Sequence, residues 1–179
     1  MLIIDNAVLV VIDVQGKLAT LMHENEKLFA NINRMIKGAR ALDIPIIWTE
    51  QIPDKLGETV PEVKSELDGI ELFTKKSFSC CGGPGFNEKL NELGKKQIIV
   101  TGIETHVCVY QTCMDLLNNN FEVHLVTDAV SSRIESNYHL GVQRIKEAGA
   151  VLTSVEMSLF EMLKVAEGEQ FKQIIQIVK

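Results

Sequence analysis

One cysteine stands where the sequence changes from an apolar strand to an amphipathic helix. Cys108 lies near the end of the segment VTGIETHVCV at residues 100–109. In the first turn of a helix, unpaired N–H groups and the positive end of the dipole favour a thiolate over a thiol and can donate to an oxyanion. Cys108 is therefore a candidate nucleophile, although taken alone it also fits a small buried hydrophobic residue, as most free cysteines are.

Two charged residues follow other apolar segments of the same kind. Asp13 lies in VVIDVQ at residues 10–15, and Lys75 lies in LFTKKSFS at residues 72–79. Taken singly, Asp13 fits a turn cap and Lys75, beside Lys76, fits a solvated surface. Together with Cys108 they form the parts of an activated nucleophile. The carboxylate takes the thiol proton, and the ammonium favours the thiolate and the charged intermediate.

The elements that must position these residues alternate between apolar and amphipathic segments. This βαβ pattern predicts a parallel sheet, and parallel strands end at one edge, where ligands bind. Strands are expected at 7–12, 45–48, 97–101 and 123–126, with weaker candidates at 70–73 and 150–152. Helices are expected at 24–42, 85–93, 106–118 and 136–148, and Gly94 and Gly149 fit C-terminal caps.

The composition indicates one globular domain spanning residues 1–179. The chain is 46% hydrophobic and 23% charged, with a net charge of -6 and no basic cluster. This balance argues against nucleic acid or an anionic membrane as a partner and favours a small-molecule substrate. No apolar run reaches membrane-spanning length, and the first fifteen residues carry Asp5 and Asp13 without a basic leader. We therefore expect a cytoplasmic protein whose four cysteines are free thiols.

Two further segments leave alternatives open. The stretch 50–69 holds two prolines and two glycines, and it fits either a functional loop or a plain crossover connection. The tail at 168–179 places apolar residues at helical spacing, so this C-terminal helix is expected to dock on its own domain or on another subunit. Cys80 and Cys81 are adjacent, which disfavours a bridge between them and indicates a loop near the pocket mouth, whereas Cys113 is expected in the core.

With these motifs in hand, the chain resembles the isochorismatase-like hydrolase superfamily, which includes nicotinamidases and N-carbamoylsarcosine amidase. The landmarks are VIDVQ (11–15), Lys75 before Phe78, GIETHVCV (102–109), TDAVSSR (127–133) and SVEM (154–157). The resemblance implies a three-layer α/β/α, Rossmann-like sandwich on a six-stranded, mainly parallel sheet. It also implies a triad of Asp13, Lys75 and Cys108, a cis peptide bond between Ile103 and Glu104, and an oxyanion hole formed by the backbone N–H groups of Glu104 and Cys108.

Departures from the relatives narrow the expected chemistry. In the family pattern the lysine stands three residues before the aromatic residue, which selects Lys75 over Lys76. Nicotinamidases bind a metal through an aspartate and two histidines after the second strand. The corresponding segment here, WTEQIPD at 48–54, has no histidine, so no metal or other cofactor is expected. His106 is expected to serve as a helix-terminus or core residue. True isochorismatases lack the nucleophilic cysteine, so Cys108 indicates acyl chemistry.

The resulting prediction is a cysteine-dependent hydrolase that cleaves an amide or carbamoyl C–N bond of a small molecule through a thioester. The pocket is expected to be lined by Gln15, Glu50, Gln51, Phe78 and Tyr110. Family members are commonly oligomeric, so a homo-oligomer is expected. One alternative is a catalytically silent scaffold or ligand-binding protein of the same fold. Another is a doubly wound nucleotide-binding module, which the single glycine of DVQGK at 13–17 disfavours.

Overall fold

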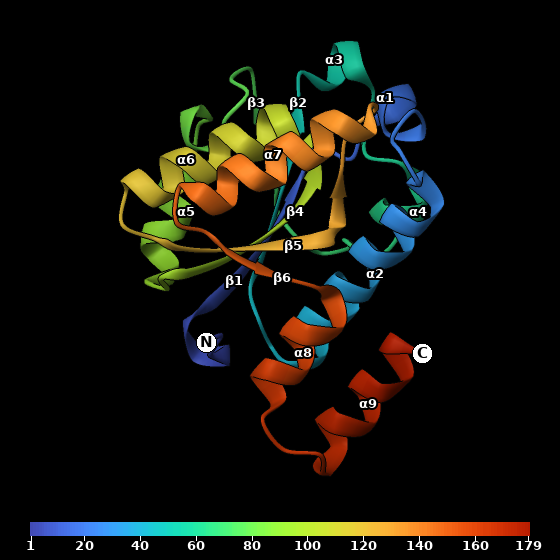
Figure 1. Ribbon diagram of the computed structural model, residues 1–179, viewed down its shortest axis with the longest axis vertical. Coiled ribbons are helices and arrows are strands. Elements are labelled where there is room, and N and C mark those ends of the chain that lie inside the picture. The colour runs from blue at the N-terminus through green and yellow to red at the C-terminus, as the bar shows by residue number, and fades with distance from the viewer.

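Six parallel strands form the central sheet of the computed structural model, which describes residues 1–179 (Figure 1). The strand order is β3-β2-β1-β4-β5-β6. The strands are β1 (Ala7–Ile12), β2 (Ile46–Gln51), β3 (Leu72–Lys75), β4 (Gln97–Ile103), β5 (Glu122–Ser131) and β6 (Val151–Thr153). From β1 to β3 the chain adds strands on one side of β1, and from β4 to β6 it adds them on the other side. The switch point therefore lies between β1 and β4, and a ligand crevice is expected beyond the carboxyl ends of these two strands.

Helices cover both faces of the sheet and give the three layers (Figure 1). The first layer contains α2 (Asn25–Ala41), α8 (Val155–Leu163) and α9 (Gly168–Val178), and the second contains α5 (Phe86–Leu93), α6 (Tyr110–Asn118) and α7 (Glu135–Glu147). Each layer closes over its own core, because successive strand residues face opposite sides. In β1, Leu9 and Val11 belong to the first core, whereas Val8 and Val10 belong to the second. The α/β sandwich predicted from the sequence is therefore confirmed, with every strand pair parallel.

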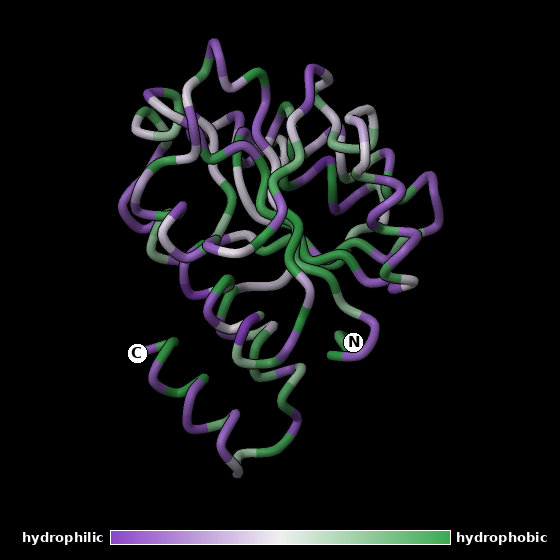
Figure 2. Tube along the Cα trace, turned by 180° about the vertical axis from the view of Figure 1, so that it is seen from behind, coloured by the Kyte–Doolittle hydropathy of each residue, from purple (hydrophilic) through white to green (hydrophobic).

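The apolar residues are concentrated along the strands, as Figure 2 shows. All six residues of β1 are buried, which explains why the strand is a continuous hydrophobic run rather than an alternating one. The tail forms α9, which packs against α2 and α8 of the same chain, with Ile174 fully buried. Of the two possibilities left open for the tail, docking on its own domain is the one observed. No helix is both long and apolar enough to cross a membrane.

Several elements differ from the sequence expectation. β2 continues through Gln51 and β5 through Ser131, because polar residues at these strand ends are buried and hydrogen-bonded and therefore escape a search for apolar runs. The helix α8 and the short helices α1 (Gly16–Thr20), α3 (Pro53–Leu56) and α4 (Pro61–Lys64) were not expected. The stretch 50–69 contains the end of β2, α3 and α4, and leads across to β3. Short 3₁₀ turns cover Ile4–Asn6 (η1) and Cys80–Gly82 (η2).

Candidate active site

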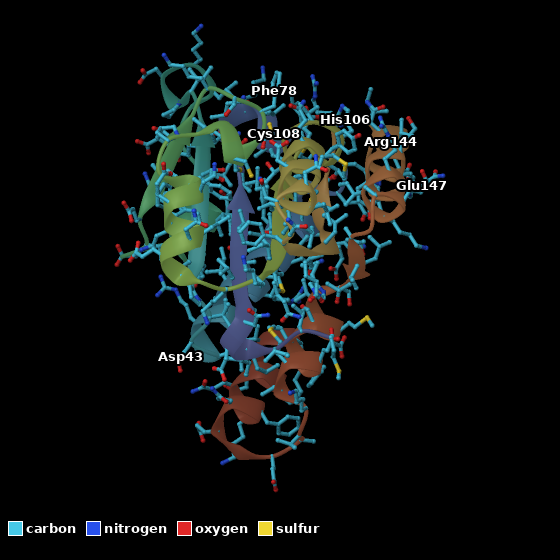
Figure 3. The ribbon with its side chains drawn as sticks, turned by 90° about the vertical axis from the view of Figure 1, so that its left-hand side faces the viewer. Asp43, Phe78, His106, Cys108, Arg144 and Glu147 are labelled. Atoms are coloured by element: carbon cyan, nitrogen blue, oxygen red, sulfur yellow. The ribbon has the colours of Figure 1, made fainter.

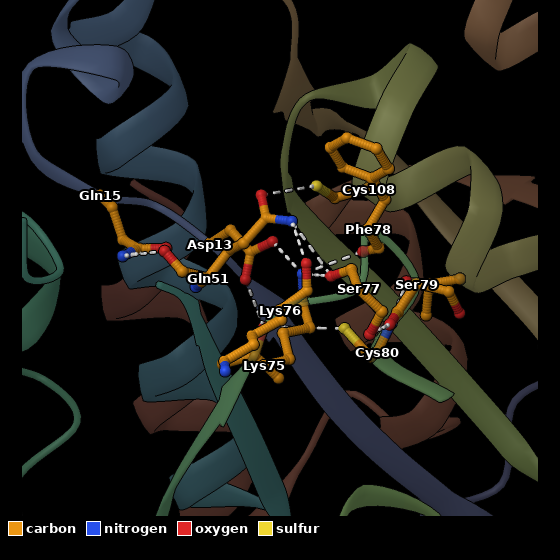
Figure 4. A network of polar contacts seen from close by, with 12 residues as sticks. Asp13, Gln15, Gln51, Lys75, Lys76, Ser77, Phe78, Ser79, Cys80 and Cys108 are labelled. Carbon is orange, nitrogen blue, oxygen red and sulfur yellow. Dashed lines mark hydrogen bonds and ion pairs between the residues drawn. The ribbon is translucent and has the colours of Figure 1, made fainter. Parts of the chain in front are cut away.

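Asp13, Lys75 and Cys108 meet at the carboxyl edge of the sheet (Figure 4). Asp13 is the first residue after β1 and adopts a left-handed backbone with φ of 52°. Lys75 is the last residue of β3, and Cys108 lies in the turn that follows β4. Their exposed fractions are 4%, 4% and 6%, so two charged side chains and a thiol are gathered in an almost solvent-free place. Lys76, the next residue along the extended segment, is exposed.

Close approach of β1 and β4 beneath the site depends on a glycine. Gly102 has a φ of 117°, and a Cβ atom there would collide with the backbone of Ile12. Glycine is the residue that accepts this conformation without strain. The strand carrying Asp13 and the strand leading to Cys108 can therefore lie side by side up to the crevice.

The ion pair between Lys75 and Asp13 is fully hydrogen-bonded. Lys75 Nζ lies 2.5 Å from Asp13 Oδ2 and also donates to the carbonyl oxygens of Ser77 (3.1 Å) and Phe78 (2.9 Å). All three ammonium hydrogens therefore have acceptors. The other carboxylate oxygen, Asp13 Oδ1, accepts from Thr49 Oγ1 at 2.8 Å. A buried pair is tolerated when its remaining groups are satisfied in this way.

Cys108 holds its proton more tightly than an ordinary thiol. Burial is the main cause that raises its pKa, and the negative charge of Asp13 and a hydrogen bond with that carboxylate add to it, while the ammonium of Lys75 opposes them. The expectation that the helix start favours the thiolate is wrong for the resting site, because desolvation outweighs the favourable charges. The nucleophile is therefore a thiol beside a carboxylate, and proton transfer to Asp13 has to accompany its attack.

The turn that carries Cys108 is irregular. The expected helix at 106–118 begins as a π-helical turn, Thr105–Val109 (η3), before α6. The peptide bond between Ile103 and Glu104 is cis. The carbonyl of Glu104 accepts from Val107 and Val109, whereas the N–H of Glu104 donates no hydrogen bond within the protein. The carboxylate of Glu104 is bound separately, by the backbone N–H and Nε of Arg133 at 3.2 and 3.1 Å.

Of the five residues expected to line the pocket, Gln51 and Phe78 lie beside Cys108 (Figure 4). Gln51 Oε1 is 3.7 Å from Cys108 Sγ. Phe78 is 52% exposed, and it lies at the same end of the molecule as Cys108 (Figure 3). Its backbone carbonyl, in contrast, is bound to Lys75. These two residues are therefore positioned to touch a molecule at Cys108.

The other three expected pocket residues have partners elsewhere. Gln15 is fully buried and pairs with the backbone of Gln51. Glu50 accepts from the N–H and hydroxyl of Thr59 at 2.6 and 2.8 Å, which ties the end of β2 to the segment after α3. Tyr110 lies under the guanidinium of Arg144, 4.8 Å from its ring centre. Gln15 and Glu50 thus hold the walls of the site in place.

One residue at the site was not anticipated, and another lies deeper than expected. Thr49 donates to Asp13, and Cys80 Sγ lies 3.6 Å from Thr49 Oγ1. Cys80 was expected in a loop near the pocket mouth, but it is fully buried, and burial raises its pKa to about 12. The available signal for Thr49 was its position directly after the apolar run of β2, at the same edge as Asp13. Cys113 is fully buried, as expected.

The histidines contribute to packing and hydrogen bonding away from the thiol. His106 Nδ1 lies 2.9 Å from the hydroxyl of Ser132, and Nε2 lies 3.5 Å from Asn137 Nδ2. His124 is buried, with Nε2 2.7 Å from Glu122. No three or more histidine, cysteine, aspartate or glutamate side chains are grouped so that they could hold a metal ion. The ionisable groups gathered around Cys108 are its own thiol, the carboxylate of Asp13 and the ammonium of Lys75.

The buried thiols predict a loss of stability at alkaline pH. All four cysteines have raised pKa values in the folded protein, chiefly because of burial. Unfolding releases these protons above a pH of about 8.5, so the stabilisation is complete below that pH and declines as pH rises. Each thiol should lower the free energy of unfolding by up to about 1.4 kcal/mol per pH unit. Urea unfolding between neutral pH and pH 10 measures this slope.

Cys113→Ala is the matched control for that measurement, because it removes one buried thiol far from the charged pair. The variant should show a slope shallower by about one quarter, since three of the four thiols with raised pKa values remain. A free energy of unfolding that does not change with alkaline pH in either protein would contradict the assignment of protonated, buried thiols.

The chain is similar to known proteins over most of its length. The isochorismatase domain family matches residues 7–157. The secreted isochorismatase effector Isc1 of Phytophthora sojae is 37% identical over 99% of this chain and 87% of that protein. Isochorismatase domain-containing protein 2 of Rattus norvegicus is 35% identical over 98% of this chain and 82% of its own length.

Solved structures share the fold over nearly the whole chain. The structure of MAR1 ribonuclease from Caenorhabditis elegans has a TM-score of 0.93 at 36% identity, covering 99% of this chain and 91% of that one. YcaC from Pseudomonas aeruginosa, solved with hexane-2,5-diol and covalent acrylamide, has a TM-score of 0.91 at 25% identity, covering 98% and 90%.

Proposed function

This chain belongs to the isochorismatase family of hydrolase folds, and from that premise we propose that it is a cysteine-dependent hydrolase of small-molecule amides or carbamoyl compounds. The observation that carries the proposal is the placement of a buried Asp13–Lys75 ion pair against the thiol of Cys108. Burying an ion pair is costly, and a pair retained next to a potential nucleophile is typical of a catalytic site. A thiol that serves only as packing needs neither neighbour.

In the first step, Cys108 Sγ attacks the substrate carbonyl carbon while Asp13 takes the thiol proton. Lys75 remains beside the carboxylate, and its charge compensates the thiolate as the proton leaves. The carbonyl electrons move to oxygen, and the oxyanion is received by the backbone N–H groups of Glu104 and Cys108. The N–H of Glu104 supports this role because no protein acceptor uses it. One such donor typically lowers the barrier by about 3 kcal/mol.

In the second step, the carbon–nitrogen bond breaks and the acyl group stays on Cys108 as a thioester. Asp13 returns its proton to the departing nitrogen, so the charge on the carboxylate is restored. A water molecule then attacks the thioester with Asp13 again acting as the base, which releases the acid and regenerates the thiol. The same carboxylate therefore serves both half-reactions, and Lys75 and Thr49 hold it in place throughout.

Trapping the acyl-enzyme tests the proposal. Purified protein is incubated with a panel of small amides, carbamoyl compounds and esters, quenched in acid and digested. Mass spectrometry should find the acyl mass on the peptide containing Cys108, and not on the peptide containing the buried Cys113. Acylation at another residue, or turnover with no acyl-enzyme and no dependence on Cys108, would contradict the proposed mechanism.

Acrylamide, which is covalently bound in the YcaC structure, offers a second probe, of thiol reactivity. Acrylamide is a primary carboxamide that alkylates thiols. A catalytically silent scaffold of the same fold is the alternative, and it predicts that Cys108 reacts with such reagents no faster than Cys113 does.

Cleavage of RNA is a weaker candidate, despite the name of the C. elegans structure. Binding a phosphate backbone requires exposed lysine or arginine side chains, and it strengthens with their number. This chain has a net charge of -6, and Lys75, the cation next to the thiol, is buried and paired with Asp13. A small neutral substrate suits this site better than a polyanion.

We also propose that the protein is cytoplasmic and forms a homo-oligomer. All four cysteines are free thiols, which fits a reducing compartment. Exposed apolar side chains such as Leu21, Ile134 and Leu140 provide surface that association of identical subunits would cover. Light scattering of the purified chain measures the number of subunits.

A further inference from the structure

The carboxamide of Gln51 is held in one orientation beside the candidate nucleophile. Its Nε2 donates to the backbone carbonyl oxygens of Lys76 (3.3 Å) and Ser77 (3.1 Å). Turning the amide over would place its oxygen against these two carbonyl oxygens, which would repel it. The hydrogen bonds therefore fix which end of the carboxamide is nitrogen and which is oxygen. Oε1 is consequently directed at Cys108, with 3.7 Å between Oε1 and Sγ (Figure 4).

The backbone of Gln51 is equally fixed. Direct pairing of β1 with β2 ends at Ile12 and Thr49. Beyond that point the side chain of Gln15 takes the place of a strand, accepting from the Gln51 N–H at 2.6 Å and donating to the Gln51 carbonyl at 3.2 Å. Gln15 Nε2 also donates to the Gly57 carbonyl, so both hydrogens of this amide nitrogen are used. On the other side Gln51 pairs with Lys75 of β3. The position of Oε1 is therefore set before any substrate arrives.

A hydrogen-bond acceptor aimed at the nucleophile restricts what can bind between the two. A thiol can donate to Oε1, but a thiolate cannot, and a developing oxyanion would be repelled by the carbonyl dipole. An ester oxygen in this position would also be repelled, because its lone pairs would face those of Gln51 Oε1. A nitrogen that carries hydrogen satisfies Oε1, because it donates. The oxyanion must then face the Glu104 side, where an unused N–H is available.

From this geometry, and resting on the hydrolase function proposed above, we infer that Gln51 Oε1 binds the unsubstituted nitrogen of the scissile group and selects primary carboxamides or ureido compounds over esters. The sulfur–carbon bond forms while the thiol proton passes to Asp13. The carbon–nitrogen bond then breaks, its electron pair stays on nitrogen, and Asp13 returns the proton, so ammonia leaves. As nitrogen gains that proton, its remaining N–H groups become stronger donors to Oε1. An interaction that strengthens toward the transition state raises kcat and does not merely lower KM.

Two substitutions at one position separate this role from a structural one. Gln51→Met keeps the size of the side chain but removes both the acceptor near sulfur and the two donors to the loop. Gln51→Glu removes the donors but keeps an acceptor. The probes are acetamide with methyl acetate and benzamide with methyl benzoate, so each pair shares an acyl group, and kcat/KM is measured for the wild type and both variants. Any general loosening of the loop slows both members of a pair alike.

In Gln51→Met, the amide-to-ester ratio of kcat/KM should fall by about 10- to 100-fold, the loss expected for one hydrogen bond to a group that becomes charged. In Gln51→Glu, both substrates should slow while the ratio stays within about threefold of wild type. Equal slowing of amide and ester in Gln51→Met would overturn the inference, as would loss of the ratio in Gln51→Glu. If the proposed hydrolase function itself were wrong, neither amide–ester pair would show turnover that depends on Cys108. The inference about Gln51 would then be wrong as well.

Discussion

Replacing Cys108 with alanine should abolish turnover of every substrate that the wild type accepts. Loss of the nucleophile in a hydrolase that works through an acyl-enzyme reduces kcat by about 10⁶, leaving what binding and the oxyanion donors provide. The fold should survive, because the side chain is small and lies at the end of its core rather than at the centre. The loss of stability should be about 1 kcal/mol. Steady-state kinetics with a urea unfolding curve measures both quantities.

Cys113→Ala is the control for the chemical effect. Cys113 lies on α6, in the same core as Cys108, and is fully buried. Its replacement removes the same atoms without touching Asp13 or Lys75, so turnover should persist while stability falls at least as much. If Cys108→Ala and Cys113→Ala retained the same activity, Cys108 could not be the nucleophile.

Replacing Lys75 with methionine should produce the largest loss of stability. The substitution leaves the buried carboxylate of Asp13 with only the hydroxyl of Thr49 and the thiol of Cys108 as side-chain donors. It also leaves the carbonyl oxygens of Ser77 and Phe78 without their ammonium partner. Removing one partner of a buried ion pair lowers the free energy of unfolding by about 3–5 kcal/mol, because the remaining charge is uncompensated. The free energy of unfolding in urea near neutral pH measures this loss.

The double variant Asp13→Asn with Lys75→Met shows whether the charge itself is the cause. Removing both charges should restore stability by at least about 1 kcal/mol relative to Lys75→Met alone, although activity stays lost. Lys76→Met is the matched surface control, and it should change stability by no more than about 0.5 kcal/mol because Lys76 is exposed. If Lys75→Met and Lys76→Met destabilised equally, the Asp13–Lys75 pair would have no special energetic role.

One physical reason made it possible to predict from the sequence both the fold and the meeting of Asp13, Lys75 and Cys108. Strands buried on both faces are continuous apolar runs, and parallel strands end at one edge, so a polar residue that ends such a run is placed without knowledge of the tertiary structure. The bounds of β1 follow directly from this pattern. The same reasoning fails for β2, whose last residues Thr49, Glu50 and Gln51 are polar yet buried.

What the sequence could not provide depends on contacts between distant segments. The pairing of Gln15 with Gln51 spans 36 positions, and neither residue type predicts such a partner. The state of the Cys108 thiol depends on a balance between burial and two opposite charges, which no motif reports. The π-helical turn at the start of α6 likewise follows from the packing of that segment.

Phe78 combines an anchored main chain with a half-exposed ring. Because the carbonyl that holds Lys75 belongs to the backbone, trimming the ring to a methyl group would remove side-chain bulk near Cys108 and leave the ammonium's acceptor in place. The aromatic side chain can therefore be changed without disturbing the contacts of the reaction centre. Bulkier acyl groups could be admitted at this residue without rebuilding the machinery that cleaves them.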